Sequence, residues 1–139
     1  MIRRIEKADS ALLSSAGKVF PDCWNKEMID SAFDGGRFFG YLYKDGENFA
    51  FITYSLSVDT ADIEDLFVSP AIRRRGIAKE LLSAALKDIG KRDKTTVFLE
   101  VRTDNVPAVN LYTSFGFEKI SVRKKYYADG DALVLKKEI

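Results

Sequence analysis

The segment SPAIRRRGIAKELL, residues 69–82, places three consecutive arginines directly before a glycine and an apolar helix. The first turn of a helix leaves backbone N–H groups unpaired and carries the positive end of the helix dipole. Gly76 and Ala78 would let an anion approach these groups closely because neither has a bulky side chain. Positive charge can be added by Arg73, Arg74 and Arg75. The segment is therefore a candidate phosphate-binding loop, with a solvated basic loop and a localisation signal as the other interpretations.

An acidic side chain in a strand-like segment is a candidate for proton transfer. Glu100 is the lone acid in VFLEV. It could point into a cleft, or could be the outward residue of an alternating strand. The sequence has no histidine, which excludes the usual general base, the histidine-containing triads and most zinc sites. We therefore expect no metal, and a carboxylate is the remaining candidate base.

Length and composition limit the classes of protein to consider. A chain of 139 residues supplies one core but not two, so residues 1–139 are expected to form one domain. The net charge of +1 argues against direct nucleic-acid binding, which usually needs a strong basic excess. No apolar run is long enough to cross a membrane, and no apolar segment follows the N-terminal arginines as in a signal peptide. The single cysteine, Cys23, excludes an internal disulfide, and we expect a cytoplasmic protein.

The hydrophobic pattern predicts strands and helices that alternate in the middle of the chain. The expected strands are residues 2–5, 37–44, 48–57, 61–68, 95–101, 117–127 and 131–138, with a hairpin at Asp45-Gly46. The expected helices run from Asp9 to about Phe20, from Asn25 to Gly35, from Gly76 to a C-terminal cap at Gly90, and from Asn105 to Gly116. This order predicts an α/β fold with a central mixed, mostly antiparallel sheet of about six to seven strands and helices on both faces.

Two motifs together resemble a known family. With the strand before it and the helix after it, Arg73-x-x-Gly76-x-Ala78 resembles the acetyl-CoA motif of the GNAT superfamily of N-acetyltransferases. The segment FLEVRTDNVPAVNLYTSFGF, residues 98–117, is similar to its branch of ribosomal-protein-alanine and other protein N-terminal acetyltransferases. RKKYY with Asp131-Ala132, and FP with Trp24, extend the resemblance to both ends of the chain.

The resemblance implies acetyl-CoA as the cosubstrate. The pyrophosphate would lie on the loop and helix N-terminus, and the pantetheine arm would contact the backbone of the preceding strand. The residues implied are Leu66, Phe67, Val68, Arg73, Arg74, Arg75, Gly76, Ile77, Ala78, Lys79, Asn105 and Ala108. Asn105 can cap a helix as well as bind the cofactor, because its side chain and backbone offer separate groups.

The resemblance also implies a catalytic pair. Glu100 would be the general base, ranked above Glu64 and Asp62, and Tyr112 would protonate the departing thiolate. An α-amine with a pKa of about 7.7–8.0 suits such a base better than a lysine amine near about 10.4. Tyr112 could instead be an ordinary packing residue beside Leu111. Cys23 is a poor nucleophile in a chain without a histidine to activate it.

The acceptor site is implied at Trp24, Tyr126 and Tyr127, although an edge strand with ordinary aromatic packing would also explain the tyrosines. Three departures from the branch bear on the acceptor: Cys23 stands where a second proline is frequent, Leu135 where methionine is frequent, and the loop after Tyr127 is short. The leading hypothesis is direct acetyl transfer in a ternary complex to a protein N-terminal α-amine, with a ribosomal protein as one candidate partner. The alternatives are acetylation of a small-molecule amine and a non-catalytic acyl-CoA-binding module.

Overall fold

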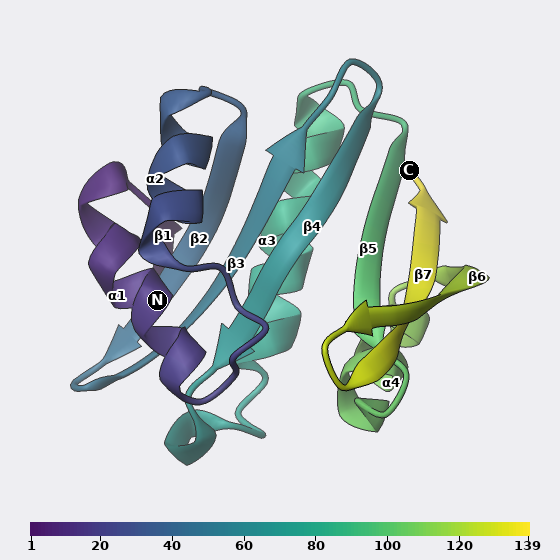
Figure 1. Ribbon diagram of the computed structural model, residues 1–139. Helices are drawn as coiled ribbons and strands as arrows, with labels where there is room; N and C mark the ends of the chain where they lie inside the picture. The colour runs from purple at the N-terminus through teal and green to yellow at the C-terminus, as the bar shows by residue number, and fades with distance from the viewer.

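A computed structural model describes all residues of the chain, 1–139. It contains one seven-stranded sheet in the order β1-β2-β3-β4-β5-β7-β6 (Figure 1). The strands are β1 (Ile2–Arg4), β2 (Phe38–Asp45), β3 (Asn48–Leu56), β4 (Thr60–Val68), β5 (Thr96–Arg102), β6 (Glu118–Tyr127) and β7 (Gly130–Glu138). The helices are α1 (Ser10–Ser14), α2 (Lys26–Asp34), α3 (Ile77–Lys91) and α4 (Val106–Ser114), with short 3-10 turns η1 (Lys7–Asp9), η2 (Ser15–Lys18) and η3 (Pro70–Ile72).

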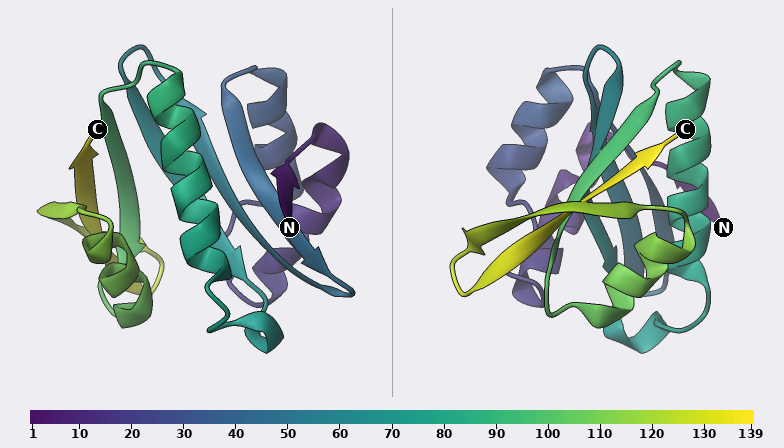
Figure 2. Two further views of the ribbon diagram at one scale, coloured as in Figure 1. Left: turned by 180° about the vertical axis from the view of Figure 1, so that it is seen from behind. Right: turned by 90° about the vertical axis from the view of Figure 1, so that its right-hand side faces the viewer.

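Helices cover both faces of the sheet, as predicted. Helices α1 and α2 lie on one face, and α3 and α4 lie on the other (Figures 1 and 2). All neighbouring strands pair antiparallel except β4 and β5, which α3 connects. The predicted mixed, mostly antiparallel sheet is therefore confirmed. None of the helices is long and apolar enough to cross a membrane.

Two expected helix boundaries differ from the structure. The segment from Asp9 to Phe20 forms the short helix α1 between 3-10 turns instead of one helix, because Ser and Gly in SSAGK are weak helix formers. The expected cap at Gly90 is wrong: α3 continues to Lys91, and the residue with left-handed backbone is Asp93, with φ of 63°. An aspartate tolerates this conformation better than most residues, so the helix does not need to end at the glycine.

Strands β4 and β5 pair over only part of their length. The parallel register joins Thr60 to Thr96 and ends where Ile63 faces Leu99. Beyond this point β4 and β5 diverge (Figure 1), and the β5-facing edge of β4 has no partner strand. The opening lies beside the N-terminus of α3, because the chain passes from the end of β4 through η3 into that helix.

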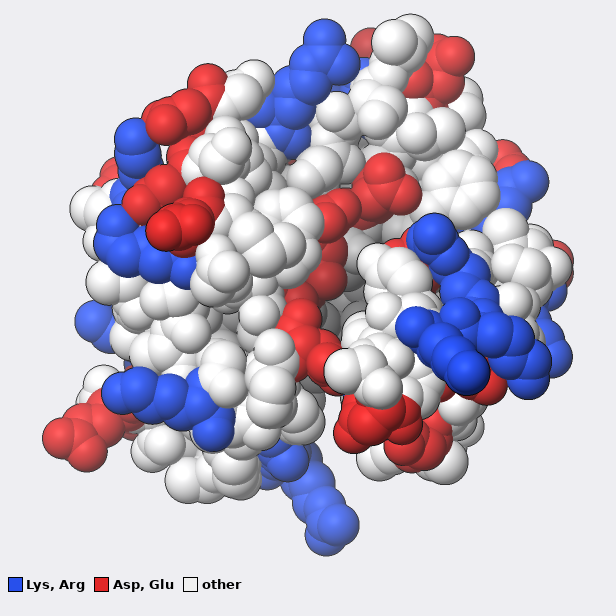
Figure 3. Space-filling view, in the orientation of Figure 1, with Lys and Arg blue, Asp and Glu red and all other residues white.

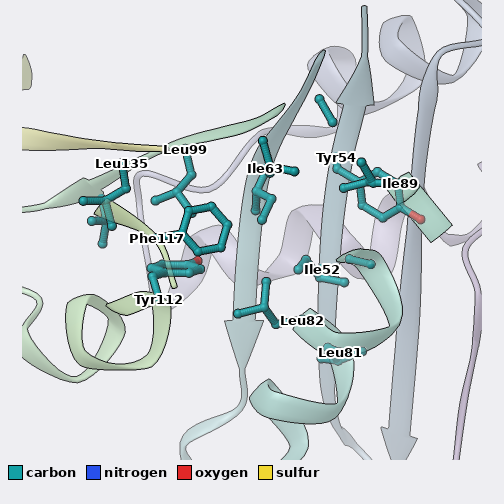
Figure 4. Close-up of a cluster of buried hydrophobic side chains, with 14 of the residues drawn as sticks. Ile52, Tyr54, Ile63, Leu81, Leu82, Ile89, Leu99, Tyr112, Phe117 and Leu135 are labelled. Atoms are coloured by element: carbon teal, nitrogen blue, oxygen red, sulfur yellow. The ribbon is translucent and has the colours of Figure 1, made fainter. Parts of the chain in front are cut away.

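Two hydrophobic clusters hold the two layers of helices against the sheet. The larger cluster packs α3 and α4 against the strands and includes Leu81, Leu82 and Tyr112 (Figure 4). The smaller one packs α1 and α2 against the opposite face and includes Leu13 and Ile29. Because these elements are packed on both sides, the diverging ends of β4 and β5 are held apart by a rigid frame.

Candidate active site

A cleft with a volume of about 930 Å³ lies where β4 and β5 diverge. It is lined by the loop before α3, the start of α4, the segment between α1 and α2, and the end of β6. Acidic side chains follow the hollow down the middle of this face (Figure 3). The cleft brings together most of the residues that the sequence predicted for the site. Of those expected to bind the cofactor, it includes Leu66, Val68, Arg73, Arg74, Gly76, Ile77, Ala78, Lys79, Asn105 and Ala108.

The helix N-terminus at one end of the cleft is open. The amides of Ile77, Ala78 and Lys79 donate no hydrogen bond, and the first helical bond runs from the Glu80 amide to the Gly76 carbonyl. Gly76 has φ of 77°, and a Cβ atom there would meet nothing within 4 Å. The glycine therefore permits the left-handed turn and leaves space beside the free amides. These features suit an anionic group.

The three arginines before this helix have different surroundings. Arg73 donates from Nε to the Val68 carbonyl at 3.0 Å and lies over the Phe20 ring. Arg75 forms an ion pair with Asp45 at 3.2 Å and does not line the cleft. Arg74 lines the cleft and has no ion pair or hydrogen bond within the protein. Arg74 is therefore the arginine that is free to contact a phosphate, and the placement of Arg75 differs from the prediction.

The open edge of β4 supplies backbone groups to the cleft. The Ser69 amide donates to the Phe49 carbonyl of β3. Because backbone groups alternate along a strand, those of Val68 face the opposite, open edge. The Phe67 side chain does not line the cleft, because it is buried against Phe51 in the smaller cluster. The expected contact between the Phe67 backbone and the cofactor stays a prediction.

Three carboxylates of β4 lie in the cleft. The pairing of β3 with β4 shifts between Thr53 and Tyr54, which leaves Glu64 as an extra residue between Ile63 and Asp65. This β-bulge turns Asp65 into the cleft as well as Glu64 and Asp62. Burial raises the pKa of Asp62, and it raises the pKa values of Glu64 and Asp65 to about 7. Glu64 has no hydrogen-bond or ion-pair partner, whereas Asp65 accepts a hydrogen bond from the Trp24 amide at 3.0 Å.

Glu100 enters the cleft from β5 on the other side. Its Oε1 atom accepts a hydrogen bond from Arg123 of β6 at 2.8 Å. The interaction with the Glu100 carboxylate, together with burial, raises the pKa of Tyr126 to about 12. The charge of Glu100 also contributes to the raised pKa values of Asp62 and Glu64. The predicted base Glu100 and its rivals therefore belong to one cluster of carboxylates.

The short helix α4 places Tyr112 at the cleft. Asn105 caps α4 by accepting the Ala108 amide at 3.3 Å, as predicted. The Tyr112 ring packs edge-on against Phe117 within the larger cluster (Figure 4), and Tyr112 also lines the cleft. Burial raises the pKa of its hydroxyl above the ordinary value, so this group is protonated at neutral pH. Both interpretations of Tyr112, packing residue and cleft residue, describe the structure.

Two chain segments enclose the other end of the cleft. We name residues 20–24 the N-terminal wall and residues 126–130 the C-terminal wall. Trp24 of the N-terminal wall stacks on Phe38 and lines the cleft. Tyr126 and Tyr127 line it from the opposite side. Adjacent residues of a regular strand point to opposite faces, but here Lys125 has φ of 53° and the β6–β7 register shifts, which allows both tyrosines to reach the cleft.

Sequence reasoning missed two residues at this site. Asp65 was missed because strict alternation along β4 does not include the bulge. Arg102 lines the cleft at the end of β5, and its position in Leu-Glu-Val-Arg was the available signal. The sequence predicts that Cys23 is a poor nucleophile. Cys23 is half-buried in the N-terminal wall, and burial raises its pKa to about 12, so it remains a thiol at neutral pH.

Comparisons with known proteins show which family the chain resembles. The model of the Acetyltransferase (GNAT) family matches residues 5–117. A protein of Haemophilus ducreyi, "[Ribosomal protein bS18]-alanine N-acetyltransferase", is 37% identical over 105 residues, covering 75% of this chain and 72% of that protein. The protein of the same name from Escherichia coli is 32% identical over 122 residues, covering 84% and 80%. The crystal structure of the ribosomal-protein-S18-alanine N-acetyltransferase from Escherichia coli has a TM-score of 0.88 at 27% identity, covering 100% of this chain and 93% of the other.

Proposed function

The chain belongs to the GNAT family of acetyltransferases, and from this premise we propose that it transfers the acetyl group of acetyl-CoA to the N-terminal α-amine of a protein. The observation that carries the proposal is the single cleft. It joins an open helix N-terminus, an unpaired strand edge, a cluster of carboxylates and an acceptor end between two aromatic walls. We further propose that residues 1–139 work as one domain, and that a ribosomal-protein acceptor would place the enzyme in the cytoplasm.

The residues at the α3 end of the cleft fit acetyl-CoA. The free amides of Ile77, Ala78 and Lys79 offer donors to a pyrophosphate, and Arg74 offers a charge that no other residue neutralises. The open edge of β4 offers the backbone of Leu66 and Val68 to an extended amide-containing arm such as pantetheine. When bound, acetyl-CoA supplies the activated thioester. The Val68 amide is the proposed donor to the carbonyl oxygen as it gains charge, a contact often worth about 3 kcal/mol in acyl transfer.

The proposed reaction is a direct transfer between two substrates bound together. The acceptor amine loses a proton to a carboxylate of the cleft, and its nitrogen forms the new amide bond to the acetyl carbon. The carbon–sulfur bond breaks, and the departing sulfur takes the Tyr112 hydroxyl proton, which solvent later replaces. The thiol state of Cys23 supports direct transfer, because a covalent acetyl carrier would need a thiolate.

Two carboxylates are candidates for the proton acceptor. The sequence ranks Glu100 first, and this remains a proposal. The charges in the structure favour Glu64, because it has no partner and its pKa of about 7 matches the operating pH of a general base. In that arrangement Glu100 holds Arg123 and interacts with Tyr126 at the acceptor end. The two assignments predict different effects of Glu64→Gln and Glu100→Gln on the pH profile of kcat.

The acceptor class is tested directly with purified protein, acetyl-CoA and short peptides that begin with Ala, Ser or Met. We expect transfer to the α-amine, located by mass spectrometry, and no transfer to the same peptides with a blocked N-terminus. Polyamines, free amino acids and lysine side chains serve as the competing amines. Turnover on these amines without any peptide acetylation would refute the proposal and favour a small-molecule acceptor.

A further inference from the structure

Arg102 is the one side chain of the cleft that is paired with both walls. Its Nη1 atom donates to Asp22 of the N-terminal wall at 3.1 Å and to Asp129 of the C-terminal wall at 2.7 Å. Its guanidinium also lies over the Tyr127 ring, 5.2 Å from the centroid. The segments that carry Asp22 and Asp129 are more than a hundred residues apart in sequence, and both bond to this group.

The surroundings of Arg102 are shaped to hold it in this position. Asp104, which belongs to neither wall, accepts from Nε at 3.1 Å and orients the guanidinium plane from the side of β5. A Cβ atom at Gly130 would come within 2.8 Å of Nη2. Gly130 does not have left-handed backbone, so an added Cβ would act here by displacing the guanidinium and not by straining the backbone. Only 22% of the Arg102 side chain is exposed.

We propose that Arg102 is a positioning residue that ties the two walls together and sets the width of the acceptor end of the cleft. The inference rests on the proposed function, because the walls are the proposed acceptor site. The individual ion pairs contribute little to fold stability, since the partners Asp22 and Asp129 are largely exposed. Their position at the mouth of the cleft gives them a different role: they hold Trp24 and Tyr127 at a fixed separation before the acceptor binds.

Arg102→Lys and Gly130→Ala test this role in different ways. Lysine keeps the charge but lacks the planar fork that reaches both aspartates. Alanine at position 130 keeps every charged group and displaces the guanidinium sterically. For both variants we expect the KM for the acceptor peptide to rise about two- to tenfold, the range for losing one or two partly exposed ion pairs. The kcat and the KM for acetyl-CoA should stay within about twofold of the wild type, because neither substitution changes a residue proposed to transfer a proton or to bind acetyl-CoA.

Asp104→Asn is the matched control, because it removes a negative charge beside the same arginine, keeps an oxygen that can accept from Nε, and leaves both walls unchanged. An increase in peptide KM equal to that of Arg102→Lys would overturn the proposal, since the effect would then follow the loss of any ion pair of Arg102 and not the loss of its contacts with the two walls. Unchanged peptide KM in both Arg102→Lys and Gly130→Ala would overturn it as well. If Arg102→Lys fails to fold, Gly130→Ala still gives the decisive measurement.

Trp24 provides a readout that needs no acceptor, because it is the only tryptophan of the chain. Freeing the N-terminal wall should make its fluorescence more accessible to acrylamide in Arg102→Lys and Gly130→Ala, and not in Asp104→Asn. Fluorescence quenching and peptide turnover together test the positioning role of Arg102 separately from the proposed function. If the wild type acetylates no peptide, the proposed function fails while quenching still tests Arg102. If peptide turnover is present and quenching is the same in all four proteins, the positioning role fails and the function stands.

Discussion

At the scale of single residues, the cleft holds three carboxylates of β4 that form no ion pair. The bulge in β4 places Glu64 beside Asp62 and Asp65, and Glu100 faces it from β5. Burial of a carboxylate disfavours its charged form, and neighbouring negative charges add to this effect. A structural role would not require such an arrangement, whereas a general base gains from it, because its pKa then lies near the pH at which it works.

The pH profile of Glu64→Gln tests whether Glu64 is the base. With both substrates saturating, wild-type kcat should fall as the pH is lowered through about 7, because the Glu64 carboxylate becomes protonated. In Glu64→Gln we expect kcat to drop on the order of 10²-fold and this acid limb to disappear. Asp65→Asn is the matched control, since Asp65 titrates near the same pH but accepts the Trp24 amide. A limb that survives in Glu64→Gln and vanishes in Glu100→Gln would assign the base to Glu100.

The same substitution should stabilise the protein above neutral pH. The pKa of Glu64 is higher in the folded chain than its ordinary value of 4.5, so the folded chain binds the proton more tightly than the unfolded chain does. The free energy of unfolding therefore falls as the pH rises from 4.5 through about 7. Glutamine does not ionise and therefore does not lose this stability as the pH rises. We expect Glu64→Gln to melt at a higher temperature than the wild type at pH 8. A lower activity with a higher melting temperature is the pattern of a group kept for function. An equal or lower melting temperature at pH 8 would contradict this origin of the pKa.

At the scale of elements, the junction between η3 and α3 makes the phosphate end of the cleft. Both Arg74 and Gly76 have positive φ, 64° and 77°, so the loop turns sharply and leaves the first amides of α3 free. Phosphate binding at this junction would depend on the free backbone amides as much as on the positive side chains, because only Arg74 of the three arginines lacks a partner. A glycine substitution therefore tests the cradle more specifically than the removal of charge.

Gly76→Ala and Gly36→Ala form a matched pair. Both glycines have left-handed backbone, with φ of 77° and 74°, and a Cβ atom would meet nothing within 4 Å at either. Each alanine should therefore destabilise the fold by about 1 kcal/mol through backbone strain alone. Only Gly76→Ala should raise the KM for acetyl-CoA, because only there does the new methyl group enter the proposed phosphate site. Similar KM values for acetyl-CoA in both variants would contradict the cradle.

Sequence patterns predicted the elements well where local chemistry sets them. Asn25 and Asn105 cap helices as their side chains allow, and Asp45-Gly46 begins the tight β2–β3 turn. The patterns failed where packing between distant segments decides the backbone. The bulge at Glu64 is defined against Thr53 and Tyr54 of another strand, and no local signal marks it. The Asp22–Arg102–Asp129 contact likewise depends on three segments that only the complete fold brings together.

At the scale of the whole molecule, an ionic network centred on Asp88 joins β1, β3 and α3. Asp88 of α3 is 6% exposed and accepts hydrogen bonds from Arg4 of β1, Tyr54 of β3 and Arg92 after α3. The network lies behind the sheet and none of its members lines the cleft. A change to this network should therefore alter the stability of the fold and not the chemistry of the cleft.

Asp88→Asn should reduce stability without altering catalysis. The bound arginines and Tyr54 lower the pKa of Asp88 to about 2 from its ordinary 3.8. The network therefore stabilises the fold above about pH 4, and this contribution is lost as the pH falls toward 2. Its size is about 1–2 kcal/mol, because Arg4 and Arg92 remain partly open to water. At pH 7 the variant should melt at a lower temperature than the wild type, while kcat and both KM values at 25 °C remain unchanged. A changed KM for acetyl-CoA would show instead that α3 must be anchored at its C-terminal end for its N-terminal amides to bind phosphate.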